Sequence, residues 1–398
     1  MARRHPNPPA QTSAQASDLY QAVGGTAACR RLSAAFYARV KQEPLLRPLF
    51  PGKTLKCAME EFAAFLAQFL GGPSQDAQRR WWVSLRESHL RFAIAPKQRD
   101  AWMKNMRKAL DDAQIEEPAR SALRGFFEQA SAYVVNQGRV SPASLEGTDP
   151  PEDHIHREIA WRWDAQRCLD ETVAAIRRGD ADGTIALAES ALLQAYFQQN
   201  PSVLAALLGL MIGHANHVLL DYARKKLLAT PNLALQRYSG RTLLHAASAA
   251  GDVTTVELLL RLGADPNVRD AGGHTPLYSV GNECRVNAGA TVVRRLVQAG
   301  ANVDAQDGVK RCTALHMAAR RGNVEVAQAL LDCGASIEVR DSLGDTPLRR
   351  SVNCDRAEVA RLLIARGADV HSKGSKGIAP LHAARSGTMK EVLARDRV

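Results

Sequence analysis

The sequence predicts an all-α protein with two parts, a compact helical domain near the N-terminus and a stack of short helical repeats toward the C-terminus. Two observations predict this fold class. Between residues 17 and 137, apolar residues recur at spacings of three and four, and glycines and prolines interrupt the pattern as they do between short helices. From residue 239 onward, a short motif returns about every 33 residues, and a period of this length indicates stacked structural repeats.

Changes in composition divide the 398 residues into segments, in keeping with the two or three domains that this length predicts. The first 16 residues combine prolines and polar residues with no apolar stretch, so they can bury nothing. Three prolines and two glycines over residues 138–151 indicate a linker. The expected order is a disordered tail over 1–16, a helical domain over 17–137, a linker over 138–151, a helical connector over 152–238 and repeats over 239–398.

Composition also excludes several classes of protein. A content of 45% hydrophobic and 23% charged residues excludes a wholly disordered chain. The net charge of +11 is concentrated in residues 1–140, which carry 21 Lys and Arg against 12 Asp and Glu, so nucleic acid is not favoured as a partner. The longest apolar stretch, residues 203–212, is too short to span a membrane. Seven scattered cysteines without a CxxC pair fit a reducing compartment, which predicts a cytoplasmic protein.

The N-terminal helical domain lacks the motifs of common enzymes. It contains no GxSxG, HExxH or GxxxxGK, so hydrolase and kinase functions find no support. One histidine, His89, precedes a new helix that Pro96 opens, and a lone histidine is weak evidence for a ligand. Phe62, Phe65 and Phe69 share one helical face. That face fits either the core of a helix bundle or a domain that encloses a flat apolar cofactor.

Six blocks in order carry a resemblance to a known family, at residues 19–25, 36–40, 44–51, 69–73, 89–94 and 99–102. Together they resemble group II of the truncated haemoglobins over residues 18–136. The resemblance implies a two-over-two helical sandwich that binds haem b, with His89 as the proximal ligand of the haem iron. It implies distal polar roles for Tyr37 and Trp102. The remaining cofactor contacts that it implies are Phe50 on the haem, Ala58 and Phe62 on the distal helix, and Phe92 beside His89.

The sequence departs from this family in two places that bear on haem binding. Relatives usually carry a polar stretch that contains histidine and proline before the proximal helix, whereas residues 79–84 of this chain read RRWWVS. Glu61 stands where relatives often offer an arginine to a haem propionate. Arg86 and Arg91 flank His89 and are the substitutes that we consider for the propionates. A domain that keeps the fold without haem therefore stays an open alternative.

The C-terminal motif returns at spacings of 33, 38, 33 and 33 residues, and its copies begin at Thr242, Thr275, Thr313, Thr346 and Ala379. The copies resemble the ankyrin repeat family, with about five repeats of which the last is truncated. The resemblance implies a module that binds a protein partner. The longer spacing predicts an insertion near residues 282–290. Residues 213–222 fit the same register and are consistent with a degenerate repeat.

Three functional hypotheses follow. The first is a haem globin that binds dioxygen, and also NO or CO, and is tethered to an ankyrin interaction module. The second is a gas or redox sensor that signals through the ankyrin surface, and the third is a haem-free adaptor. Nitric oxide dioxygenase-like or weak peroxidase activity would need an external reductase, because no flavin or nicotinamide motif follows.

Overall fold

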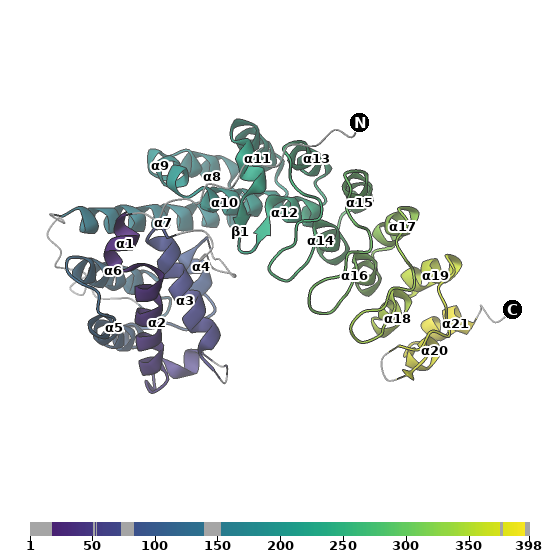
Figure 1. Cartoon of the computed structure of the whole chain (residues 1–398), viewed down its shortest axis with the longest axis horizontal. Helices are drawn as coiled ribbons and strands as arrows, with labels where there is room; N and C mark the ends of the chain where they lie inside the picture. The colour runs from purple at the N-terminus through teal and green to yellow at the C-terminus, as the bar shows by residue number, and fades with distance from the viewer. Residues whose placement is uncertain are drawn as a thin grey trace, which may run out of the picture. The chain divides into compact units, whose positions relative to one another are not determined.

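The computed structural model describes residues 18–50, 52, 54–72, 83–138, 153–374 and 377–394. Most of the described residues are helical and very few are in strands, as Figure 1 shows, so the expected all-α class is confirmed. The described residues form two compact units, one within residues 1–171 and 190–200, the other within residues 172–189 and 201–398. The expected tail over 1–16 and all but the first residue of the expected linker over 138–151 lie outside the described residues.

The main helices of the first unit pack in pairs, as expected for a two-over-two helical sandwich. Helix α2 packs against both α3 and α5, and α5 packs against α6. Phe36, Leu66, Met106 and Phe127, one from each of these four helices, are buried in a common core. The helices are α1 (Asp18–Val23), α2 (Gly25–Val40), α3 (Lys56–Phe69), α4 (Leu85–His89), α5 (Pro96–Asp112) and α6 (Ala119–Tyr133), with a 3-10 turn η1 (Arg47–Leu49) before α3.

Local sequence explains where these helices begin and end. Gly24 and Gly25 both have positive φ angles, of 98° and 63°, which separates α1 from α2. Pro96 occupies the first turn of α5, where a missing N–H costs nothing. Glycine and proline therefore mark the boundaries of these helices, as the sequence predicts.

Helix α7 (His154–Arg178) extends the core of the first unit beyond residue 137. Its residues Ile159 and Trp163 are buried in the same core as Phe36, and the Trp163 ring lies 5.6 Å from that of Phe126. Helix α9 (Ala191–Gln199) also belongs to this unit, where Tyr196 contacts Trp161 at a ring separation of 5.7 Å. Part of the segment that looked like a connector is thus a component of the helical domain.

The second unit is a stack of helix pairs. The first helices of successive pairs pack on one another in the order α10, α12, α14, α16, α18 and α20, and the second helices do so in the order α11, α13, α15, α17, α19 and α21 (Figure 1). The first set comprises α10 (Pro201–His214), α12 (Leu243–Ala250), α14 (Pro276–Glu283), α16 (Ala314–Arg321), α18 (Pro347–Asn353) and α20 (Pro380–Ala383). The second set comprises α11 (His217–Ala229), α13 (Val253–Arg261), α15 (Gly289–Gln298), α17 (Val324–Asp332), α19 (Ala357–Ala365) and α21 (Gly387–Ala394).

The described part of this unit also contains smaller elements. They are α8 (Ala181–Ala188), a 3-10 turn η4 (Pro231–Leu235) and one antiparallel hairpin of β1 (Arg237–Tyr238) and β2 (Arg241–Thr242). No helix of the described residues is both long enough and apolar enough to cross a membrane. All seven cysteines are free thiols.

Buried histidines link neighbouring repeats. The backbone N–H of Thr313 donates to His316 Nδ1 at 3.2 Å, and His316 Nε2 donates to the carbonyl of Asp345 in the next repeat at 3.1 Å. His245 makes the same pair of bonds, with Thr242 and the carbonyl of His274. Burial lowers the pKa of His245 to about 4 and also lowers that of His316, so both rings are neutral.

We predict that His316→Ala lowers the free energy of unfolding by about 2–4 kcal/mol, because it leaves a buried carbonyl and a buried N–H without partners and opens a cavity. Urea denaturation followed by circular dichroism measures the change. His382→Ala is the matched control, since His382 occupies the same position in the last repeat but is exposed. Equal losses of stability in the two variants would contradict the role of the buried His316 hydrogen bonds in linking the repeats.

Candidate functional site

His89 is the last residue of α4, a helix of five residues. Ser84 caps the start of this helix, because its Oγ accepts a hydrogen bond from the N–H of Glu87 at 3.0 Å. His89 Nδ1 lies 2.8 Å from the carbonyl oxygen of Leu85, one helical turn earlier. A carbonyl can only accept, so Nδ1 carries the proton of the ring and Nε2 keeps a lone pair.

The state of His89 suits a metal ligand. Burial is the main cause that lowers the pKa of His89, so the neutral imidazole is favoured at neutral pH. Among the described residues, Nε2 has no hydrogen-bond partner. A neutral ring that donates from Nδ1 to a backbone carbonyl and exposes Nε2 is the arrangement that orients histidine toward a metal ion.

Asn136, which follows α6, holds the segment after His89. Its Nδ2 donates to the carbonyl of Phe92 at 2.8 Å, and its Oδ1 accepts from the N–H of Ile94 at 2.9 Å. Sequence reasoning missed this residue, because an asparagine near the end of a helical domain carries no signal of a partner 42 residues earlier.

Aromatic side chains from α2, α3, α5 and the residue after η1 lie close together. The Tyr37 ring on α2 lies 5.6 Å from Phe50 and 6.3 Å from Phe62 on α3. Trp102 on α5 lies 5.1 Å from Phe36, which also contacts Tyr37 at 5.3 Å. The structure therefore brings Tyr37, Phe50, Phe62 and Trp102 into one aromatic cluster. Ala58 lies one turn before Phe62 on the same face of α3.

Phe92 joins this cluster to the histidine. Its ring lies 6.2 Å from that of His89 and 5.8 Å from that of Phe50. Continuous ring contacts thus run from His89 to Trp102, although these residues come from distant parts of the sequence. Each of the six rings that the sequence resemblance selected takes part in these contacts.

Two polar groups of the cluster are available as hydrogen-bond donors. Among the described residues, no hydrogen bond is made by the Tyr37 hydroxyl or by the Trp102 indole N–H. Burial raises the pKa of Tyr37 well above its usual range, so its hydroxyl stays protonated and can donate. Buried polar groups in folded proteins are usually hydrogen-bonded. Two donors that bond to none of the described residues, in a cluster that reaches His89 through Phe92, fit a small acceptor ligand.

The two flanking arginines lie in different surroundings. The guanidinium of Arg86 lies 5.6 Å from the ring centre of Tyr133 on α6. That of Arg91 lies over Phe92 at 4.7 Å. Besides burial, the positive charge of Arg91 acts on the pKa of both Tyr37 and His89, which places this charge near the site.

Comparison with known proteins agrees with this geometry. Residues 18–136 match the family model of bacterial-like globins. The group 2 truncated hemoglobin YjbI of Bacillus subtilis (strain 168) is 36% identical over 118 residues, which cover 30% of this chain and 88% of that protein. The chain belongs to the truncated haemoglobins. Its globin domain is therefore a haem-binding domain by family.

The second unit matches ankyrin repeats, at residues 239–271 for one repeat and 282–374 for three copies. The tyrosine-protein kinase HTK16 of Hydra vulgaris is 34% identical over 116 residues, which cover 29% of this chain and 15% of the kinase. The human Ankyrin repeat and SOCS box protein 16 is 35% identical over 112 residues, 28% of this chain and 24% of that protein. The chain thus spans less than a quarter of these two proteins, and the shared part is an interaction module.

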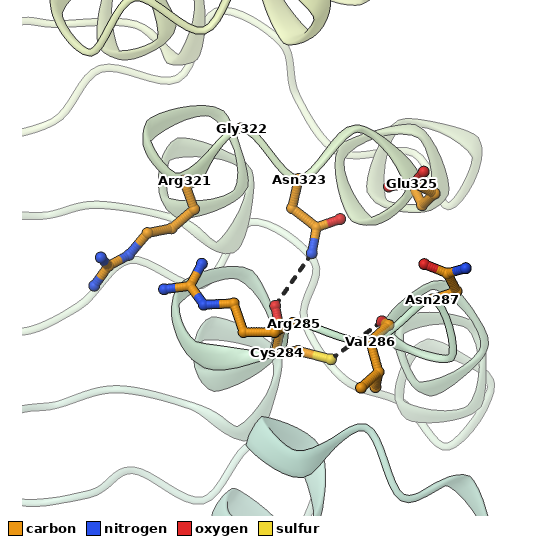
Figure 2. Close-up of a pocket in the computed structure, with 8 residues that line it drawn as sticks. All are labelled: Cys284, Arg285, Val286, Asn287, Arg321, Gly322, Asn323 and Glu325. Atoms are coloured by element: carbon orange, nitrogen blue, oxygen red, sulfur yellow. Dashed lines mark hydrogen bonds between the residues drawn. The ribbon is translucent and has the colours of Figure 1, made fainter.

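A small open pocket lies at the long repeat of this truncated haemoglobin's ankyrin unit, between the loop after α14 and the turn that joins α16 to α17 (Figure 2). Asn323 Nδ2 donates to the carbonyl of Cys284 at 3.2 Å, and Arg321 Nη2 donates to Asn282 Oδ1 at 2.9 Å. Helices α12 and α16 each end at a glycine in the left-handed conformation. Helix α14 ends at Cys284 instead, and these two bonds connect the end of α14 to the next repeat. Two of these lining residues, Cys284 and Asn323, thus bond to each other across the pocket.

We predict that His89→Gly abolishes stable haem uptake by the full chain and that added imidazole restores it, because free imidazole can occupy the space of the lost ring. The Soret absorption band after haemin is added measures uptake. His154→Ala is the control, since His154 is exposed at the start of α7. A Soret band of normal size in His89→Gly without imidazole would remove His89 from the site.

Proposed function

We propose that the globin domain binds haem b through His89 Nε2 and thereby binds dioxygen reversibly, as well as NO or CO. One observation carries the proposal. The hydrogen bond from His89 Nδ1 to Leu85 fixes a ring whose Nε2 has a free lone pair. This ring connects through Phe92 and Phe50 to the donors at Tyr37 and Trp102.

The bound haem would supply an iron that takes a diatomic gas. The protein would supply two donors, the hydroxyl of Tyr37 and the indole N–H of Trp102. A hydrogen bond to a charged or strongly polarised acceptor contributes about 1.5–3 kcal/mol. Donors of this kind favour slow release of dioxygen, so we propose retention of the gas rather than rapid delivery.

Enzymatic activity is not part of this proposal. Efficient peroxide cleavage needs an acid-base group next to the cofactor, whereas the distal helix presents Ala58 and Phe62. Oxidation of NO by bound dioxygen would need a separate reductase for each turnover. A binding protein is therefore the function that the site supports best.

The ankyrin unit would bring a protein partner. Exposed apolar side chains lie in its loops, with Val309 at 76% and Leu343 at 58% exposure in successive repeats. Charge contributes little to the choice of partner, because residues 141–398 carry 31 Lys and Arg against 29 Asp and Glu. We propose that α10 and α11 form a further, degenerate repeat, since they pack on α12 and α13 as later pairs pack on each other.

Tyr37→Phe is expected to raise the dissociation rate of dioxygen by roughly 10- to 100-fold, because a hydrogen bond of about 1.5–3 kcal/mol is lost. Stopped-flow spectroscopy of the haem-loaded full chain measures the rate. Tyr20→Phe is the control, since the Tyr20 hydroxyl bonds to Thr26 in the core rather than in the aromatic cluster. If the rate in Tyr37→Phe equals that of the control, Tyr37 does not hold the gas.

A further inference from the structure

Helix α7 places three polar residues at intervals of four, so Arg162, Gln166 and Asp170 share one face of the helix. All three are buried, with exposures of 1%, 8% and 4%. They lie outside residues 18–136, the part of the chain that matches the globin family. Buried polar side chains on one helical face need partners, and among these partners are backbone groups at the end of α3 and at the beginning of α4.

Asp170 contacts the beginning of α4. Its Oδ1 accepts from the N–H of Leu85 at 2.9 Å, and its Oδ2 accepts from the N–H of Arg86 at 3.1 Å. These two N–H groups belong to the first turn of α4 and have no acceptor within the helix. Burial raises the pKa of this carboxyl, while the hydrogen bonds it accepts act against the rise.

Gln166 orients Asp170 and fixes the residue before the cap. Its Nε2 donates to Asp170 Oδ1 at 3.0 Å and to the carbonyl of Val83 at 2.9 Å. Arg162 acts at the other helix, where its Nη1 donates to the carbonyl of Phe69, the last residue of α3, at 3.2 Å. A negative group at the start of α4 and a positive group at the end of α3 both complement the helix dipoles.

One peptide group joins Asp170 to His89. The N–H of Arg86 and the carbonyl of Leu85 belong to the same peptide unit. Its N–H donates to Asp170, and its carbonyl accepts from His89 Nδ1 at 2.8 Å. Hydrogen bonds in such a chain polarise one another, so a carboxylate at one end strengthens the bond at the other.

We propose that Asp170 is a positioning residue for the haem site, which acts through the peptide group between Leu85 and Arg86 to orient His89 and increase its strength as a ligand. Gln166 supports it by holding the carboxylate. The inference rests on the proposed function, because it assigns a task to α7 in haem binding. Through it, a helix beyond the globin family region becomes part of the cofactor site.

The test compares Asp170→Asn with Asp164→Asn in the full chain. Asp164 is an exposed residue of the same helix that pairs with Arg167, so its loss controls for a change of charge on α7. In the haem-loaded ferrous protein, we expect Asp170→Asn to shift the iron–histidine stretching band to lower frequency in resonance Raman spectra. Release of haem to excess apomyoglobin should accelerate on the order of tenfold. Asp164→Asn should match the unaltered chain in both.

A general loss of stability would not move the stretching band, so a shifted band reports on the bond between iron and histidine. An unchanged band in Asp170→Asn would overturn the proposal. If Asp170→Asn does not fold, Gln166→Ala decides, with a smaller shift in the same direction expected. An unchanged band and an unchanged rate of haem release in Gln166→Ala would then overturn it.

Hydrogen–deuterium exchange of the haem-free chain separates this inference from the proposed function. We expect the peptide that covers residues 83–92 to exchange faster in Asp170→Asn than in Asp164→Asn, because an asparagine offers one acceptor oxygen where the carboxylate offers two, and so one of the two N–H groups loses its acceptor. A chain that takes up no haem would contradict the proposed function, and equal exchange in the two variants would contradict the role of Asp170.

Discussion

The hydrogen bond between His89 Nδ1 and the Leu85 carbonyl is the interaction on which the site depends. It decides which nitrogen carries the proton, and so it decides which nitrogen can bind a metal. The bond exists because α4 is helical between these two residues, and α4 has only five residues with which to hold itself in shape. Its stability therefore has to come from outside the helix, from Ser84 and from Asp170.

The aromatic cluster likewise depends on residues that are distant in the sequence. Tyr37, Phe62 and Trp102 come from α2, α3 and α5, and the packing of these helices fixes the spacing of the rings. Helix α7 completes the arrangement, since Trp163 lies against Phe126 and Arg162 bonds to the end of α3. The globin domain of this chain thus includes residues that its family region does not contain.

Much of the fold could be predicted because its determinants are local. The repeats can be recognised from motifs such as those at Thr242 and Thr313, in which each threonine bonds to a histidine three residues later. Most of the residues that we propose for the haem site come from six blocks that occur in a family order. Asp170 and Asn136 could not be selected in this way, because each acts on a segment more than 40 residues away. In a helical pattern, such polar residues look the same as residues that face solvent.

Proton nuclear magnetic resonance of the haem-loaded ferrous protein tests the central claim most directly, since it observes the ring proton of the axial histidine. If His89 Nε2 binds the iron while Nδ1 donates to Leu85, one exchangeable proton should appear far outside the normal spectral range. It should carry a coupling to nitrogen in protein labelled with 15N-histidine, and it should exchange slowly because its acceptor is a backbone carbonyl. The absence of such a signal, or its persistence after replacement of His89, would contradict the account.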